Sequence, residues 1–166
     1  MRKQVFSLLV NNNAGLLSRV AGLFSRRGYN IDSITSGATM NDRVTRITVV
    51  ARGDEQILSQ IQKQLAKLED VIDIKVLEDG KSVCRELIMV KVKANAAQRA
   101  EIISIADIFR AKIVDVAKES LIVELTGTQD KIDAFLKLLD GFEILELART
   151  GIAGLSRGVD NLNDIE

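Results

Sequence analysis

One turn near the start of the chain carries the residues best suited to binding a small anion. Its sequence is NNNAG, residues 11–15, and it lies between a strand-like run and a helical run that begins at Leu16. The first N–H groups of a helix have no partners within the helix, and the helix dipole is positive at that end. The same turn also fits a plain structural role, in which Asn12 or Asn13 caps the helix and Gly15 is a flexible joint.

Chemistry that depends on histidine or on several cysteines is excluded within one chain. There is no His and a single Cys, Cys84. Cys/His metal sites and His-based triads therefore cannot form, and the lack of an internal disulfide fits a reducing compartment. Carboxylate or Lys chemistry stays open, but each adjacent acidic pair lies at a helix end or in a linker, where a solvated role explains it better. These pairs are Asp54/Glu55, Glu69/Asp70 and Glu78/Asp79. We expect no catalytic residue and no metal ligand.

The balance of charges argues against nucleic-acid and membrane partners. Lys plus Arg and Asp plus Glu both number 23, so the chain has no net charge to attract a polyanion or an anionic lipid surface. No apolar run is long enough to span a bilayer, and the basic N-terminus leads into a strand pattern rather than a signal-peptide core. With 46% apolar and 28% charged residues, the chain is predicted to be a soluble, cytoplasmic protein of one or two domains.

The first half of the chain has the order strand, helix, strand, strand, helix, strand. Apolar residues recur at helical spacing from Leu16 to Phe24, Gly28 stands where a left-handed C-terminal residue is expected, and Asp54 is placed to cap the second helix. The expected elements are strand 5–10, helix 16–27, a hairpin of strands 31–40 and 44–52, helix 54–68 and strand 71–77. Right-handed crossovers turn this order into a four-stranded antiparallel sheet with both helices on one face.

The same order repeats in the second half. The expected elements are strand 86–93, helix 96–109, a hairpin of strands 113–117 and 121–126, a helix capped by Thr128, and strand 142–148. The predicted fold class is α+β, with two tandem ferredoxin-like βαββαβ units. We assign residues 1–78 to the first domain, 79–82 to a linker and 83–166 to the second domain, whose flexible tail is expected to fray from Gly151.

The open face of each sheet needs a cover. Units of this size bury a limited fraction of their surface, and apolar residues occur on both faces of strand 44–52. The other repeat or a second chain is the expected cover. The sequence therefore predicts at least a homodimer.

The two repeats differ at the turn that opens the first helix of each. Residues 10–15, VNNNAG, align with residues 92–97, VKANAA, so the second turn lacks the Gly and keeps one Asn. If Gly and Asn served only the construction of the fold, both turns would need them. The difference favours a ligand site in the first repeat alone.

Three stretches of the chain resemble the small, regulatory subunit of acetolactate synthase (acetohydroxyacid synthase). They are residues 12–33 (NNAGLLSRVAGLFSRRGYNIDS), 85–92 (RELIMVKV) and 148–158 (ARTGIAGLSRG). The likeness covers essentially the whole chain in the same order. It is more specific than a general likeness to ACT domains.

That resemblance implies a regulatory function rather than catalysis by this chain. It implies an N-terminal ACT domain that binds a branched-chain amino acid, a C-terminal ferredoxin-like domain, and a dimer that docks on a separate large catalytic subunit. The catalytic subunit of the family holds thiamine diphosphate, a divalent metal such as Mg and FAD, so we expect no cofactor in this chain. The small subunit raises the activity of its partner and makes it sensitive to valine, or to leucine or isoleucine.

The resemblance also implies where the effector binds. In the family it lies between two ACT domains, held by the turn after the first strand of one and by the start of the second strand of the other. The matching positions are Asn12, Asn13, Ala14, Gly15, Leu16 and Leu17, together with Asn30 and Ile31 of the neighbour. Backbone amides at the helix start suit the effector carboxylate, and Asn carbonyl oxygens suit its ammonium group. The family often has an acidic residue where this chain has Asn13.

Two further functions remain as alternatives. The chain could be a free-standing amino-acid-sensing ACT module with another partner. RNA recognition by a ferredoxin-like sheet is disfavoured, because such modules need stacking aromatics and a basic surface, whereas this chain has one Tyr, five Phe and no net charge.

Overall fold

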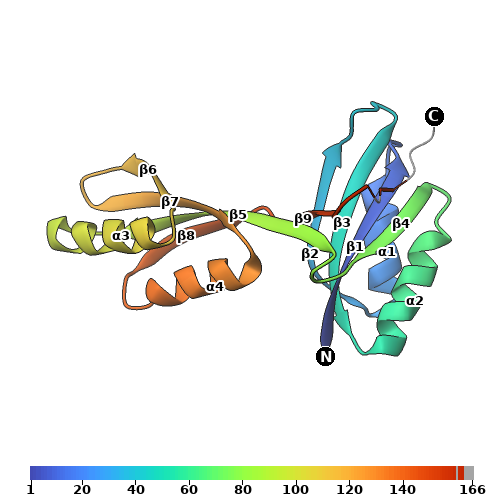
Figure 1. The fold of residues 1–166 in the computed structure, drawn as a ribbon, viewed down its shortest axis with the longest axis horizontal. Helices are drawn as coiled ribbons and strands as arrows, with labels where there is room; N and C mark the ends of the chain where they lie inside the picture. Colours follow the sequence, from blue (N-terminus) through green and yellow to red (C-terminus); the bar gives the residue numbers. More distant parts are fainter. Residues whose placement is uncertain (160, 163–166) are drawn as a thin grey trace. The chain divides into compact units, whose positions relative to one another are not determined.

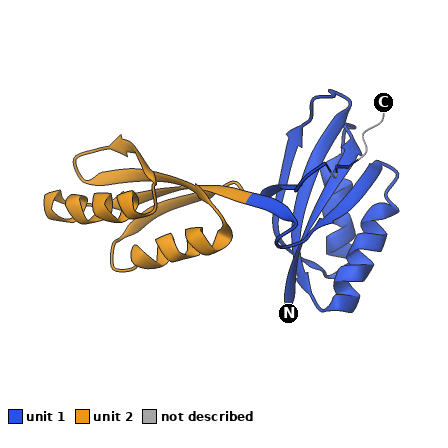
Figure 2. Cartoon of the chain, in the orientation of Figure 1, with its two compact units in different colours: residues 1–84, 152–166 blue, residues 85–151 orange. Residues whose placement is uncertain are grey.

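The chain folds into two compact units of the same plan. The structure is a computed structural model that describes residues 1–159, 161 and 162. One unit comprises residues 1–84 with residues 152–166, and the other comprises residues 85–151 (Figure 2). Each contains the order β-α-β-β-α-β with an antiparallel sheet and two helices (Figure 1). The predicted α+β class with two tandem ferredoxin-like units is confirmed.

The first unit is a four-stranded sheet with both helices on one face (Figure 1). The strand order is β2-β3-β1-β4. Its elements are β1 (Arg2–Asn11), α1 (Leu16–Arg27), β2 (Asn30–Ala38), β3 (Val44–Gly53), α2 (Glu55–Ala66) and β4 (Val71–Leu77). Phe6, Leu8 and Val10 alternate along β1 and pack against the helices, as the period of a strand requires.

Helix α1 is held by one apolar stripe and ends where the sequence predicts. Its buried residues are Leu16, Val20, Leu23 and Phe24, spaced three and four apart. Burying side chains of this size contributes about 1.5–3 kcal/mol each. Gly28 has φ 66°, the left-handed conformation that terminates a helix without strain in glycine.

The second unit repeats the arrangement, with the strand order β6-β7-β5-β8. Its elements are β5 (Ser82–Lys93), α3 (Ala96–Ile108), β6 (Lys112–Val116), β7 (Ser120–Gly127), α4 (Gln129–Leu138) and β8 (Ile144–Arg149). Its core is built from Ile, Val and Leu of the strands with Phe135 of α4. Within the described residues, no helix is long and apolar enough to cross a membrane.

The compact units divide the chain differently from the predicted domains 1–78 and 83–166. Strand β5 begins at Ser82, inside the predicted linker 79–82, and continues into the second unit. The described residues from 152 onward belong with the first unit. A boundary drawn from polar composition alone missed this return of the chain.

The expectation that the chain frays from Gly151 is wrong for the described residues. Strand β9 (Ala153–Ser156) pairs with β5, and the carbonyl oxygen of Ile152 accepts a hydrogen bond from Thr35 Oγ1 at 3.1 Å. Ile152 and Leu162 are both buried, so the segment gains apolar contacts as well as strand pairing. The rest of the predicted flexible tail, residue 160 and residues 163–166, lies outside the described residues.

This C-terminal segment also covers part of the sheet face that the helices leave open. Leu9 lies between Leu8 and Val10 on β1 and therefore points to the opposite face. It is nevertheless only 1% exposed, and it packs in a cluster with Val44 and Leu162. For Leu9 the cover is the chain's own C-terminal segment, rather than the other repeat or the second chain that the sequence predicted. The homodimer stays a prediction.

Candidate ligand-binding site at the start of α1

Helix α1 begins without a side-chain cap. Its N-cap is Gly15, with φ 79° and ψ 3°, and no side chain hydrogen-bonds to the helix start. The other helices are capped by the side chains of Asp54, Asn95 and Thr128, as predicted for the first and last of these. The expectation that Asn12 or Asn13 caps α1 is therefore wrong. Orphan N–H groups at this helix start are left for another acceptor.

The two Asn side chains hold the loop instead of capping the helix. Asn13 Nδ2 donates to Asp70 Oδ1 at 3.0 Å, and Asn12 Nδ2 donates to the carbonyl oxygen of Asp42 at 3.3 Å. The backbone N–H of Asn12 donates to the carbonyl oxygen of Arg43 at 2.9 Å. The loop is thereby fastened to the turn between β2 and β3 and to the turn between α2 and β4.

Asp70 is the centre of this network, and sequence reasoning missed it. It was considered only within the pair Glu69/Asp70 and given a solvated role, yet it is 9% exposed. Its Oδ2 accepts from Arg19 Nε at 2.6 Å, and its carbonyl oxygen accepts from the Asn11 N–H at 2.8 Å. The pKa of Asp70 is held below its usual value, mainly by the hydrogen bond from Asn13 and next by the hydrogen bond from Arg19.

Arg19 was also missed, although its spacing contained a signal. It lies four residues after Gly15, and residues four apart face each other on a helix. Its Nη2 donates to the Ala14 carbonyl oxygen at 3.4 Å, so the guanidinium spans the loop. A Cβ added at Gly15 would lie 3.3 Å from Arg19 Nη1. Glycine is therefore favoured here both by its positive φ and by the close guanidinium.

The two leucines at the helix start have different roles. Leu16 is 5% exposed and belongs to the core of the first unit. Leu17 is 49% exposed, and Ala14 and Gly15 are exposed as well. Of the two predicted apolar contacts, Leu17 is the one that can touch a ligand.

Asn30 and Ile31 lie far from this loop within one chain. On β3, Asn30 pairs with Arg52, whereas Asn11 at the end of β1 pairs with Val44. Those two β3 positions are eight residues apart, which is about 27 Å along an antiparallel strand. The structure brings residues 12–17 together in one loop and helix start, with Leu16 buried, and leaves Asn30 and Ile31 at the other end of the sheet. Their assignment to the site through a neighbouring chain stays a prediction.

Both halves of the chain match sequence models of one protein family. The model described as "AHAS small subunit-like ACT domain" matches residues 6–73, and the model described as "Small subunit of acetolactate synthase" matches residues 85–158. This chain belongs to the acetolactate synthase small-subunit family. The loop at the start of α1 thus lies in an ACT domain, and the family resemblance inferred from the sequence is confirmed.

Relatives from archaea and bacteria extend the match over nearly the full chain. The probable acetolactate synthase small subunit of Methanothermobacter thermautotrophicus is 53% identical over 93% of this chain and 92% of its own. The small subunit of acetolactate synthase isozyme 3 of Salmonella typhimurium is 46% identical over 94% of this chain and 96% of its own. The crystal structure of the acetolactate synthase small subunit from Thermotoga maritima superposes with a TM-score of 0.87 at 38% identity, over 95% of this chain and 99% of that one.

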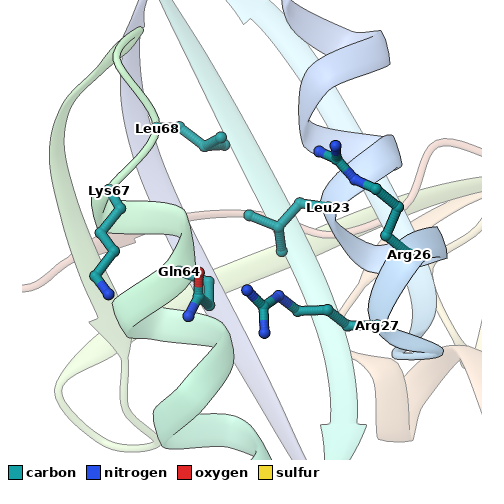
Figure 3. Close-up of a pocket in the computed structure, with 6 residues that line it drawn as sticks. All are labelled: Leu23, Arg26, Arg27, Gln64, Lys67 and Leu68. Carbon is teal, nitrogen blue, oxygen red and sulfur yellow. The ribbon is translucent and has the colours of Figure 1, made fainter.

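A separate cavity in the ACT domain does not include any predicted site residue. It has a volume of about 530 Å³ and lies between the C-terminal parts of α1 and α2 (Figure 3). Its lining residues are Leu23, Arg26, Arg27, Gln64, Lys67 and Leu68. Cations near helix C-termini are favoured by the helix dipoles, which accounts for this basic lining without a ligand. Among the described residues, no group of three or more His, Cys, Asp or Glu could hold a metal ion.

Proposed function

We propose that this chain is the regulatory subunit of an acetolactate synthase. It activates a separate large catalytic subunit and makes that subunit subject to feedback inhibition by valine, or by leucine or isoleucine. Membership in the small-subunit family and the ACT domain at the N-terminus support this function. The catalytic subunit carries thiamine diphosphate, Mg and FAD, and this chain, acting in the cytoplasm, carries no cofactor.

The observation that carries the effector proposal is the uncapped start of α1. An amino acid needs donors for its carboxylate, and the N–H groups of Gly15 and Leu17 supply them at the positive end of the helix dipole. The loop around these amides is held from outside by Asp42 and Asp70, so its amides do not need to be reordered when the ligand binds. The ammonium group needs acceptors, which side-chain carbonyl oxygens of Asn12 and Asn30 provide.

A second copy of the chain completes the site. Asn30 and Ile31 are about 27 Å from the loop along β3 of the same chain, so they reach an effector at the loop only from a neighbour. The branched side chain of the effector then lies against Leu17 and Ile31. Because one methylene in an apolar pocket discriminates by only about 10–200-fold, valine, leucine and isoleucine compete for the same site.

Regulation follows from a site that two chains share. An effector that touches both chains binds more tightly to the dimer geometry in which the loop and the start of β2 meet. It shifts the equilibrium between dimer geometries only by its differential affinity for them. The catalytic subunit senses that geometry.

Calorimetric titration of the branched-chain amino acids into the pure chain tests this proposal, with sedimentation measured in parallel. Saturable valine binding at about one molecule per chain, by a protein that sediments as a dimer or larger, is the expected result. An absence of binding by all three amino acids, both to the pure chain and to its mixture with the large subunit, overturns it. If a pull-down with this chain recovered a different, thiamine-independent partner, that result would favour a free-standing ACT module instead.

A further inference from the structure

The amide group of Asn13 has an orientation that chemistry fixes. A carboxylate in its charged form only accepts hydrogen bonds, so the group of Asn13 that faces Asp70 Oδ1 at 3.0 Å must be the Nδ2 donor. The other end of the amide is then Oδ1, which accepts no hydrogen bond among the described residues. Asn13 is exposed, so this acceptor is open to a ligand.

Asp70 itself is not free to turn away. Its second oxygen holds Arg19 Nε at 2.6 Å, and its backbone carbonyl oxygen holds the Asn11 N–H at 2.8 Å. The residue is 9% exposed. The carboxylate is therefore held in place, and it fixes which end of the Asn13 amide faces outward.

Asn13 also lies beside the N–H groups assigned to the effector carboxylate. Its backbone carbonyl oxygen accepts from the Leu16 N–H at 3.4 Å, which places Asn13 at the first turn of α1. The ammonium and carboxylate groups of an amino acid are attached to one carbon atom. An acceptor for the ammonium must therefore stand close to the helix start that holds the carboxylate, and Asn13 meets this requirement.

Asp70 further neutralises a cation that would repel the ammonium group. The Arg19 guanidinium crosses the loop and reaches the Ala14 carbonyl oxygen at 3.4 Å. Paired with Asp70, it adds no net charge to the loop. Without Asp70 it becomes an uncompensated positive charge next to the effector site.

We propose that Asp70 is a positioning residue of the effector site, which fixes the Asn13 amide so that its Oδ1 accepts a hydrogen bond from the effector's ammonium group. This assignment rests on the proposed function and adds Asn13 to the acceptors for the ammonium. It assigns Asp70 and Arg19 to the regulatory machinery, although neither touches the effector. It also explains how an uncharged residue serves at position 13.

Exchange of the two side chains tests the assignment, with L-valine as the probe in calorimetric titrations of the full chain. In Asp70→Asn, the new amide no longer requires a donor from Asn13 and no longer neutralises the charge of Arg19, so valine binds about tenfold more weakly or worse. In the double variant Asn13→Asp/Asp70→Asn, the amide at position 70 donates to the carboxylate at position 13 and still accepts from Arg19. An oxygen again faces outward, and affinity returns to within about threefold of the wild type.

Two more variants separate this effect from charge and folding. Glu69→Gln removes a neighbouring exposed carboxylate, whereas the side-chain hydrogen bond of Asn13 goes to Asp70, and it binds valine like the wild type. Asn13→Ala keeps the bond between Asp70 and Arg19 but removes the acceptor, and it loses about tenfold in affinity. Thermal unfolding of each variant shows whether it is folded.

The outcomes distinguish this inference from the proposed function. Wild-type valine affinity in Asn13→Ala overturns the inference, and so does a double variant no tighter than Asp70→Asn. In both cases valine binding by the wild type leaves the proposed function standing. If the wild type binds no branched-chain amino acid alone or with the large subunit, the proposed function fails and the inference fails with it.

Discussion

Replacing Gly15 by Asp should abolish effector binding without unfolding the ACT domain. Gly15 has φ 79°, and a residue with a Cβ in this left-handed region costs about 1–2 kcal/mol. A Cβ would also lie 3.3 Å from Arg19 Nη1, which the exposed guanidinium can accommodate by a small movement. For a chain of this length, the strain lowers the melting temperature by about 2–8 °C.

Gly15→Ala is the matched control, because it has the same backbone strain and no charge. A carboxylate at position 15 lies at the positive end of α1, and Asp tolerates a left-handed backbone better than Ala. Gly15→Asp is therefore at least as stable as Gly15→Ala. It nevertheless repels the effector carboxylate from the same N–H groups, and the loss of hydrogen bonds to a charged ligand weakens binding by about 10–150-fold beyond the control.

Thermal unfolding and calorimetric titration with valine on the three proteins measure the two effects separately. Gly15→Asp should be at least as stable as Gly15→Ala and should bind valine more weakly. If Gly15→Asp binds valine as tightly as Gly15→Ala, the effector carboxylate is not held at the start of α1. If both variants match the wild type in stability, the left-handed conformation of Gly15 is not required.

Three further predictions follow from burial and contacts. Leu16→Ala lowers the free energy of unfolding by about 2–5 kcal/mol, measured by chemical denaturation, because Leu16 is 5% exposed. Leu17 is 49% exposed, so Leu17→Ala leaves that free energy nearly unchanged and weakens valine binding, measured by calorimetry. Gly154→Ala destabilises the docking of β9, because its Cβ would lie 2.6 Å from Cys84 Sγ, and hydrogen exchange of residues 153–156 becomes faster. The pKa of Asp70 is lowered in the folded chain, so its contribution to stability is complete above its unfolded pKa and is lost as pH falls through the folded value. Urea unfolding from pH 6 to 3 should therefore show a steeper fall in the free energy of unfolding for the wild type than for Asp70→Asn. Equal pH dependence of the two proteins would contradict this prediction.

Local signals account for the parts of the fold that the sequence predicted correctly. The apolar stripe of α1, the left-handed Gly28 and the caps Asp54 and Thr128 depend on residues within one or two turns of each other. The repeated order of strands and helices then follows from the sum of such signals.

The parts that the sequence did not predict depend on distant partners. Asn is a residue type preferred at N-caps, but the side chain of Asn13 donates to Asp70, 57 residues further along the chain. Only the folded structure shows that the turn before β4 reaches the start of α1. The C-terminal segment is similar, because Leu162 packs in a cluster with Leu9 and Val44, which lie more than a hundred residues earlier in the chain.

The site residues stay a prediction, but the structure shows how the loop that carries them is built. The loop, its Gly and its helix start were all recognisable in the sequence. The supporting contacts of Asp70 and Arg19 were not recognisable. In the sequence, Glu69 and Asp70 look like the other adjacent acidic pairs, and only the structure shows that Asp70 is buried. Leu16 changes from a candidate contact to a core residue because the stripe it shares with Val20 faces the sheet.

Valine inhibition of the reconstituted enzyme tests whether this chain is the regulatory subunit of an acetolactate synthase. The large catalytic subunit is assayed for acetolactate formation alone, with this chain, and with this chain plus valine, in parallel with Gly15→Asp. We expect the wild-type chain to raise the rate and valine to lower it again, whereas the variant raises the rate and leaves it insensitive to valine. A rate that neither the chain nor valine changes would contradict the assignment of this chain as the regulatory subunit.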